Sequence, residues 1–179
     1  MKKTRKIVVI SLLISLGLVL HLVESFFPLS AVVPGAKLGL ANIVSLIAIS
    51  LFGFPAAFQV VIFRVILGSL LAGTFMTINF YLSFSGGILS FVLMYLAYYF
   101  FKDYFSLIGI SIIGAVAHNT AQITAAYFII ANTGIFYYLP FLILLALPTG
   151  FGVGLVSYFT LKHLPYSITG GNFYDKKSK

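Results

Sequence analysis

Runs of apolar residues alternate with short polar breaks along most of the 179-residue chain. An α-helix rises about 1.5 Å per residue, so roughly 20 apolar residues are needed to cross the hydrocarbon core of a bilayer. Five runs reach about this length and the second along the chain is shorter; the six cover residues 7–27, 38–52, 56–74, 80–101, 105–131 and 137–161. The pattern predicts an all-α integral membrane protein, with residues 1–179 forming a single domain of six transmembrane helices.

The polar breaks are too short to hold a further domain. Gly53-Phe54-Pro55 is a tight turn, and Asn132-Thr133-Gly134 is another. Proline lacks a backbone N–H, so Pro148 is expected to kink or loosen the sixth span. Residues 162–179 are polar and are expected to form a cytoplasmic tail.

Composition and charge support a multi-pass protein of the cell membrane. Hydrophobic residues make up 61% of the chain and charged residues 8%, and the formal net charge is +8. Most cations flank alternate spans, as in the positive-inside pattern of cytoplasmic loops. Both termini and the Lys102-Asp103 turn are therefore predicted to be cytoplasmic, with Lys37 and Asn132 outside. No basic stripe is interleaved with exposed aromatic residues, which argues against binding of nucleic acid.

The sequence offers little for catalysis. It contains no cysteine, so thiolate metal sites and cysteine nucleophiles are excluded. Its three acids, Glu24, Asp103 and Asp175, are far apart, and no phosphate-binding loop of the GxxxxGK[ST] type is present. We expect a protein without enzymatic activity and without a cofactor.

Polar residues nevertheless occur inside the apolar spans. Depths estimated from the helical rise place polar groups of five spans in the outer half of the membrane, with Arg64 somewhat deeper. They are His21, Glu24, Asn42, Arg64, Ser85, His118 and Gln122. Buried polar groups are costly unless they are satisfied, so this layer indicates either a ligand pocket or a network of interhelical hydrogen bonds.

Two stripes of small and polar residues strengthen the expectation of a site. Gly114, His118, Ala121, Gln122 and Ala125 share one face of the fifth span. Small residues on such a face let another helix approach or leave a cavity.

On the third span, Arg64, Gly68 and Ala72 form a similar stripe. A structural ion pair between Arg64 and Glu24 is one alternative to a ligand site. A metal held by His21, Glu24 and His118 is another, but no ligand spacing supports it, and we expect no metal.

The loop before the second span is expected to form the lip of the pocket. Its sequence is Pro34-Gly35-Ala36-Lys37-Leu38-Gly39-Leu40-Ala41-Asn42. Proline and glycine shape the turn, Lys37 adds a cation, and Asn42 places an amide at the start of the next apolar run.

This loop resembles a signature of the Gx transporter family, which is also labelled heptaprenyl diphosphate synthase component I. Two further segments carry the resemblance, Ser85-Gly86-Gly87 and Gly114-Ala115-Val116-Ala117-His118-Asn119-Thr120-Ala121-Gln122. The resemblance implies a fold similar to the S components of energy-coupling factor transporters. Those proteins bind a vitamin-like ligand near the outer face and dock on a transmembrane coupling subunit driven by two ATPases.

The resemblance also bears on docking and on chemistry. S components dock through a small-xxx-small motif in the first helix, and here Ser11 and Ser15 have that spacing, with serine where alanine is usual. The synthase label implies elongation of prenyl chains, which ordinarily needs aspartate-rich motifs to hold magnesium and diphosphate. This chain has no such motif.

We therefore predict a membrane-embedded protein that binds a small, vitamin-like or precursor-like molecule for uptake. The alternative is a non-catalytic membrane subunit of a flavin- or quinone-linked electron-transfer system or of an isoprenoid-synthesis system. The candidate ligand-binding residues are His21, Glu24, Lys37, Asn42, Arg64, Ser85, His118, Asn119 and Gln122.

Overall fold

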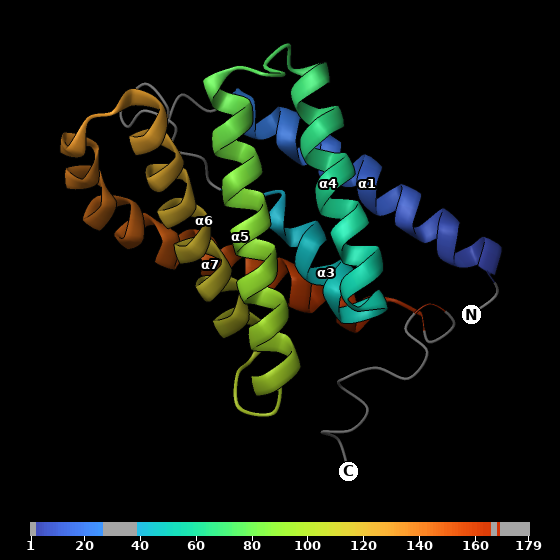
Figure 1. Ribbon diagram of the computed structural model, residues 1–179. Coiled ribbons are helices and arrows are strands. Elements are labelled where there is room, and N and C mark those ends of the chain that lie inside the picture. The colour runs from blue at the N-terminus through green and yellow to red at the C-terminus, as the bar shows by residue number, and fades with distance from the viewer. Residues whose placement is uncertain (1–2, 27–38, 166–167, 169–179) are drawn as a thin grey trace.

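The computed structural model describes residues 3–26, 39–165 and 168, and these form a bundle of helices without strands (Figure 1). Within these residues, six α-helices and one 3₁₀ helix follow in order: α1 (Lys3–Ser25), α3 (Asn42–Phe52), α4 (Phe54–Leu71), α5 (Ile78–Phe101), α6 (Leu107–Ile130), η1 (Thr133–Tyr138) and α7 (Leu139–His163). Five helical segments are long and apolar enough to cross a membrane. The prediction of an all-α, multi-pass membrane protein is confirmed.

The second predicted span needs correction. α3 has 11 residues, which corresponds to about 16 Å of helix and does not cross a bilayer. The helix begins only at Asn42 because Gly39 has a φ of +73° and its carbonyl accepts a turn bond from the Asn42 N–H. Residues 42–49 are all buried, so α3 is a core helix of the bundle. Leu38, where the span was predicted to begin, lies outside the described residues.

The remaining spans were predicted to within a few residues. The first helix begins four residues earlier than predicted, at Lys3, and the first two residues of the predicted sixth span belong to η1 before α7 runs to His163. Pro148 does not interrupt α7, which is continuous around it. Thr149 donates from its hydroxyl to the carbonyl of Leu145 at 2.9 Å, within the turn that contains the proline.

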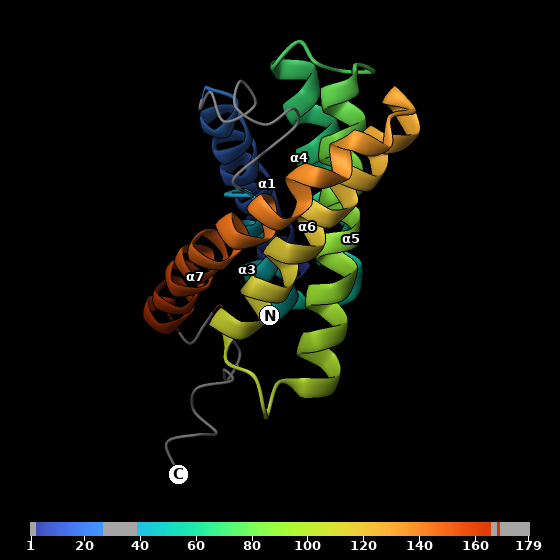
Figure 2. The same cartoon turned by 90° about the vertical axis from the view of Figure 1, so that its left-hand side faces the viewer.

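The long helices alternate in direction. Figure 1 shows α1, α4 and α6 running toward one end of the bundle, and α3, α5 and α7 running back. The first turn of α1, the Lys102-Asp103 turn and the last turn of α7 therefore lie at the same end. Figure 2 shows α7 running obliquely across the bundle relative to α5, with α6 alongside it. This arrangement brings the positions predicted to be cytoplasmic together.

Glycines set the closest helix contact. An added Cβ at Gly150 would lie 2.8 Å from the Ile112 Cα, and one at Gly154 would lie 2.6 Å from the Ile108 Cα. Small residues at such spacing let two membrane helices pack backbone to backbone. α6 is thereby held against α7 on one side, while His118 and Gln122 lie against Gly86 of α5 on another.

Candidate functional site

Arg64 lies at the centre of a polar cluster between α1, α3, α4 and α5. It is 3% exposed, and its Nη2 donates a hydrogen bond to the Asn42 Oδ1 at 2.9 Å. Glu24 is near enough to attract the guanidinium electrostatically. Gly17 of α1 makes room for the side chain, because a Cβ there would lie 3.3 Å from the Arg64 Cβ. The helix positions around Arg64 are therefore shaped to enclose a cation.

Glu24 and His21 extend the cluster along α1. The Gly39 N–H donates to a carboxylate oxygen of Glu24, which ties the end of α1 to the turn before α3. His21 packs against α4, where a Cβ on Gly68 would lie 2.9 Å from the imidazole Cδ2. Both side chains are buried. The loop start, α1 and α4 thus meet around polar groups.

A pair of glycines in α5 connects this cluster to α6. A Cβ on Gly86 would lie 2.9 Å from the His118 Cε1 and 3.0 Å from the Gln122 Cγ. On the next residue, a Cβ on Gly87 would lie 3.6 Å from the Arg64 Nη2. The two glycines therefore let Arg64 approach α5 from one side and His118 and Gln122 from another. A side chain at Gly86 would crowd His118 and Gln122, whereas the nearest neighbour of one at Gly87 would be Val65, at 3.3 Å.

Two buried groups of the cluster lack hydrogen-bond partners among the described residues. Gln122 is 1% exposed, and neither its Oε1 nor its Nε2 is paired; the same holds for the Nε of Arg64. An unpaired buried polar group costs about 1–3 kcal/mol, so each such group needs an explanation. A donor and an acceptor that point into the bundle without partners are suited to hydrogen-bond a ligand.

Several predicted site residues lie elsewhere. Asn119 donates from Nδ2 to the Leu142 carbonyl at 2.8 Å, so it joins α6 to α7 and points away from Arg64. Ser85 bonds the carbonyls of Leu82 at 3.1 Å and Ala121 at 3.5 Å, on the outer side of α5. The structure thus groups His21, Glu24, Asn42 and Arg64, and joins His118 and Gln122 to them through the adjacent glycines of α5. Ser85 and Asn119 make their contacts elsewhere.

The remaining predicted residues are Lys37, Ser11 and Ser15. Lys37, expected at the lip of the pocket, lies outside the described residues. Ser11 and Ser15, expected to dock a partner, are exposed on α1, and the Ser15 hydroxyl donates to the Ser11 carbonyl at 3.0 Å. Within residues 3–26, 39–165 and 168, no group of three or more histidine or acidic side chains is placed to hold a metal ion.

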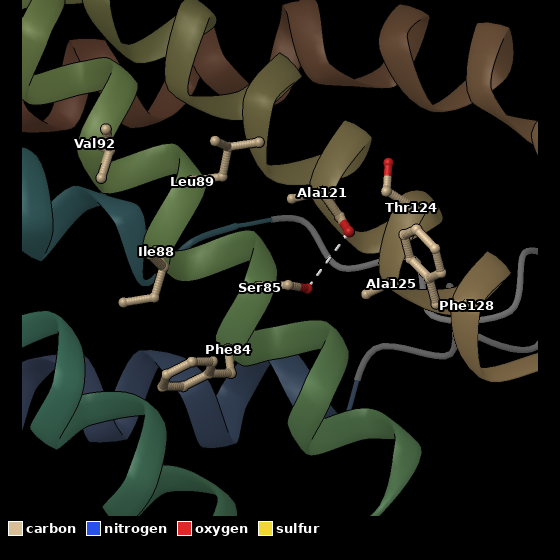
Figure 3. Close-up of a pocket in the computed structure, with 9 residues that line it drawn as sticks. All are labelled: Phe84, Ser85, Ile88, Leu89, Val92, Ala121, Thr124, Ala125 and Phe128. Carbon is tan, nitrogen blue, oxygen red and sulfur yellow. Dashed lines mark hydrogen bonds between the residues drawn. The ribbon is translucent and has the colours of Figure 1, made fainter.

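An apolar groove runs along the outer seam of α5 and α6, and the sequence reasoning missed it. Its volume is about 460 Å³. Figure 3 shows its lining residues, which are Phe84, Ser85, Ile88, Leu89, Val92, Ala121, Thr124, Ala125 and Phe128. They follow i, i+3/i+4 spacing on both helices. This spacing is visible in the sequence, but it is equally typical of a helix face that contacts lipid.

Comparison with known proteins assigns the chain to one family. The family model described as heptaprenyl diphosphate synthase component I matches residues 13–160, which include every described residue of the polar cluster. No curated protein and no solved structure matches the chain. The match covers most of the 179 residues, from the first span into the last. The chain therefore belongs to the heptaprenyl diphosphate synthase component I family.

Proposed function

We propose that this protein is a non-catalytic binding protein of the cell membrane that holds a small molecule at the Arg64–Gln122 cluster. The observation that carries the proposal is the Gln122 amide, buried in the bundle with neither of its polar atoms paired among the described residues. The unpaired Nε of Arg64 offers a second donor on the other side of the Gly86-Gly87 pair. A ligand with complementary hydrogen-bonding groups would satisfy both.

The chemistry of the cluster supports binding better than catalysis. Arginine remains protonated and cannot act as a base, and Glu24 is engaged by the Gly39 N–H. A glutamine amide neither attacks a substrate nor moves a proton under ordinary conditions. Arg64 and Gln122 are suited to orient a ligand through hydrogen bonds, and the histidines of the cluster, which can move a proton, have no cysteine nucleophile to activate in this chain. We infer that the protein has no enzymatic activity of its own.

Uptake is the role that this binding serves in our proposal. The resemblance to S components implies that a transmembrane coupling subunit with two ATPases supplies the energy. On α1, Ser11 and Ser15 lie on an exposed face together with Leu12, Leu16 and Val19. Such a face, with small residues one turn apart, suits packing against a helix of another membrane protein.

The family description favours a second candidate. The words "component I" are those of one part of a synthase with more than one part. In that role the chain would be a non-catalytic membrane subunit that binds a substrate or product of isoprenoid synthesis, or a flavin- or quinone-linked partner. What co-purifies separates the two roles: a vitamin-sized ligand and a coupling subunit in the first, and a synthase or redox partner in the second.

The decisive experiment replaces the unpaired amide. Gln122→Leu should abolish retention of the native ligand, measured by mass spectrometry of the purified protein. It should leave the melting temperature without ligand unchanged or raise it, because an unsatisfied buried group is removed. The matched control is Gln59→Leu, which changes an exposed glutamine of α4. Normal ligand retention by Gln122→Leu would refute the proposal, as would early melting of the ligand-free variant.

A further inference from the structure

The carboxamide of Gln122 is a buried group with both a donor and an acceptor that no described residue uses. Gln122 is 1% exposed, and neither its Oε1 nor its Nε2 is paired among those residues. The oxygen accepts and the NH₂ group donates, and the two lie in one plane on the same carbon atom. The other buried carboxamides are engaged, since Asn42 accepts from Arg64 and Asn119 donates to a backbone carbonyl of α7. Gln122 therefore offers a complete donor–acceptor edge for recognition of a ligand.

A second unused donor lies close to this edge. The Nε of Arg64 is buried and unpaired within the described part of the chain. A Cβ on Gly86 would lie 3.0 Å from the Gln122 Cγ. One on the adjacent Gly87 would lie 3.6 Å from the Arg64 Nη2. Because adjacent Cα atoms are about 3.8 Å apart, the Gln122 Cγ and the Arg64 Nη2 are separated by at most about 13 Å. One small molecule can therefore reach both groups.

The charges of the cluster select a neutral molecule. Glu24 attracts the Arg64 guanidinium, so a carboxylate on the ligand would add an anion without a counter-charge. A carboxylate also presents acceptors only, and one of its oxygens would face the Gln122 Oε1 with no hydrogen between them. An ammonium or amidinium group presents donors only and would be repelled by Arg64. The group that pairs with Gln122 must therefore be uncharged and must combine a donor with an acceptor.

We propose that the molecule held at the Arg64–Gln122 cluster carries a planar edge on which an N–H group and a carbonyl oxygen lie side by side, as in a lactam, a cyclic imide or a cyclic urea. Its N–H donates to the Gln122 Oε1, and its carbonyl accepts from the Gln122 Nε2. A further acceptor of the molecule takes a hydrogen bond from the Arg64 Nε. The inference rests on the proposed function, because it names the class of ligand for the same site.

A ring fits this edge better than a flexible chain does. A ring fixes the N–H and the carbonyl in the plane that the carboxamide requires, so little conformational freedom is lost on binding. The surroundings also suit an apolar ring, because a Cβ on Gly87 would lie 3.3 Å from the Val65 Cγ2 and 3.9 Å from the Val61 Cγ1. These valines offer hydrocarbon contacts beside the polar groups.

The test uses two matched pairs of probes, 2-pyridone with N-methyl-2-pyridone and 2-quinolone with N-methyl-2-quinolone. Methylation removes the N–H donor and leaves the ring and its carbonyl. Each probe is titrated calorimetrically into the full-length protein in nanodiscs. We expect saturable binding of the lactam in at least one pair. Its N-methyl partner should bind at least about tenfold more weakly, because one buried hydrogen bond is lost and the Gln122 Oε1 stays unpaired.

Gln122→Met shows whether this preference comes from the carboxamide. The change nearly keeps the size of the side chain and removes both polar atoms. It should weaken binding of the lactam to the level of its N-methyl partner. Gln59→Met, at an exposed position of α4, is the matched control and should keep the preference.

Three results would overturn the inference: equal binding of lactam and N-methyl partner, no binding of either pair, or a preference that Gln122→Met retains. The native ligand judges the proposed function separately. If Gln122→Leu loses the native ligand and the lactams show no preference, the ligand class falls and the proposed function stands. If Gln122→Leu retains the native ligand, the proposed function itself falls.

Discussion

Gly86 provides the most direct test of the packing around the polar cluster. In the change Gly86→Ala, the added methyl group would lie 2.9 Å from the His118 Cε1 and 3.0 Å from both the His118 Nδ1 and the Gln122 Cγ. Carbon atoms in contact normally lie about 3.5–4.0 Å apart, so the two side chains must move by several tenths of an ångström. Both belong to α6, which is fixed against α7 by the close contact at Gly150 and Gly154.

Two opposing contributions determine how much Gly86→Ala changes the free energy of unfolding. Overpacking a well-packed interior costs about 1–3 kcal/mol. Replacing glycine by alanine inside a helix contributes about 0.5–1 kcal/mol in the favourable direction. Gly86→Ala should therefore lower the free energy of unfolding by about 0–2.5 kcal/mol. Its effect on ligand binding should be larger than its effect on stability, because the displaced groups are the ones proposed to contact the ligand.

Gly152→Ala in α7 is the matched control. No atom lies within 4 Å of the Cβ it would gain, so only the favourable helix term applies. Melting temperatures in detergent, with and without the retained ligand, measure both effects. Gly86→Ala should melt below Gly152→Ala and should retain less ligand. If the two variants melt together and bind equally, the close approach of α5 to His118 and Gln122 is wrong.

Three further predictions concern topology, charge and chemistry. Because the chain has no cysteine, single cysteines at positions 102 and 132 can be probed with an impermeant thiol reagent in intact cells. Labelling is expected at 132 and not at 102, and the reverse result would overturn the topology. Arg64→Leu should leave the helices inserted, since leucine is favourable in hydrocarbon, but should abolish ligand retention. A fully functional Arg64→Leu/Glu24→Leu double variant would instead show that the two residues are only an ion pair. The isolated protein should elongate no prenyl chain when incubated with isoprenyl precursors and magnesium, and product above that of an unrelated membrane protein would contradict this.

The apolar pattern was sufficient to predict most of the fold. Long apolar runs leave a helix as the only way to satisfy the backbone in lipid, so the five long spans follow from hydropathy alone. The second span was overestimated because Leu38–Phe52 is apolar whether it faces lipid or protein. The turn at Gly39 and the burial of residues 42–49 of α3 depend on neighbouring helices, which hydropathy does not report.

The sequence predicts how deep in the membrane the candidate site residues lie, but not in which direction their side chains point. Helical rise placed His118 and Gln122 in one layer, and Asn119 was a candidate beside them, but adjacent residues on a helix point about 100° apart. The structure accordingly directs Asn119 to the Leu142 carbonyl, while His118 and Gln122 face Gly86. Ser85 likewise lies on the groove side of α5, next to Gly86, which faces His118 and Gln122. Only the packing of α6 against α7 decides which face of α6 looks inward.

The charge balance of the cluster constrains what it can bind. Burying a cation without compensation is expensive, and Glu24 supplies one negative charge near Arg64. A ligand with a full negative charge would therefore add an uncompensated anion to a nearly neutral site, since Asn42 and Gln122 carry no charge. Arg64 already donates one hydrogen bond to Asn42, so its role toward a ligand is that of a positioned N–H donor more than that of a counter-ion. The arrangement thus favours a ligand whose polar end is neutral and pairs by hydrogen bonds, with selectivity set by the Gln122 amide and the close fit around Gly86.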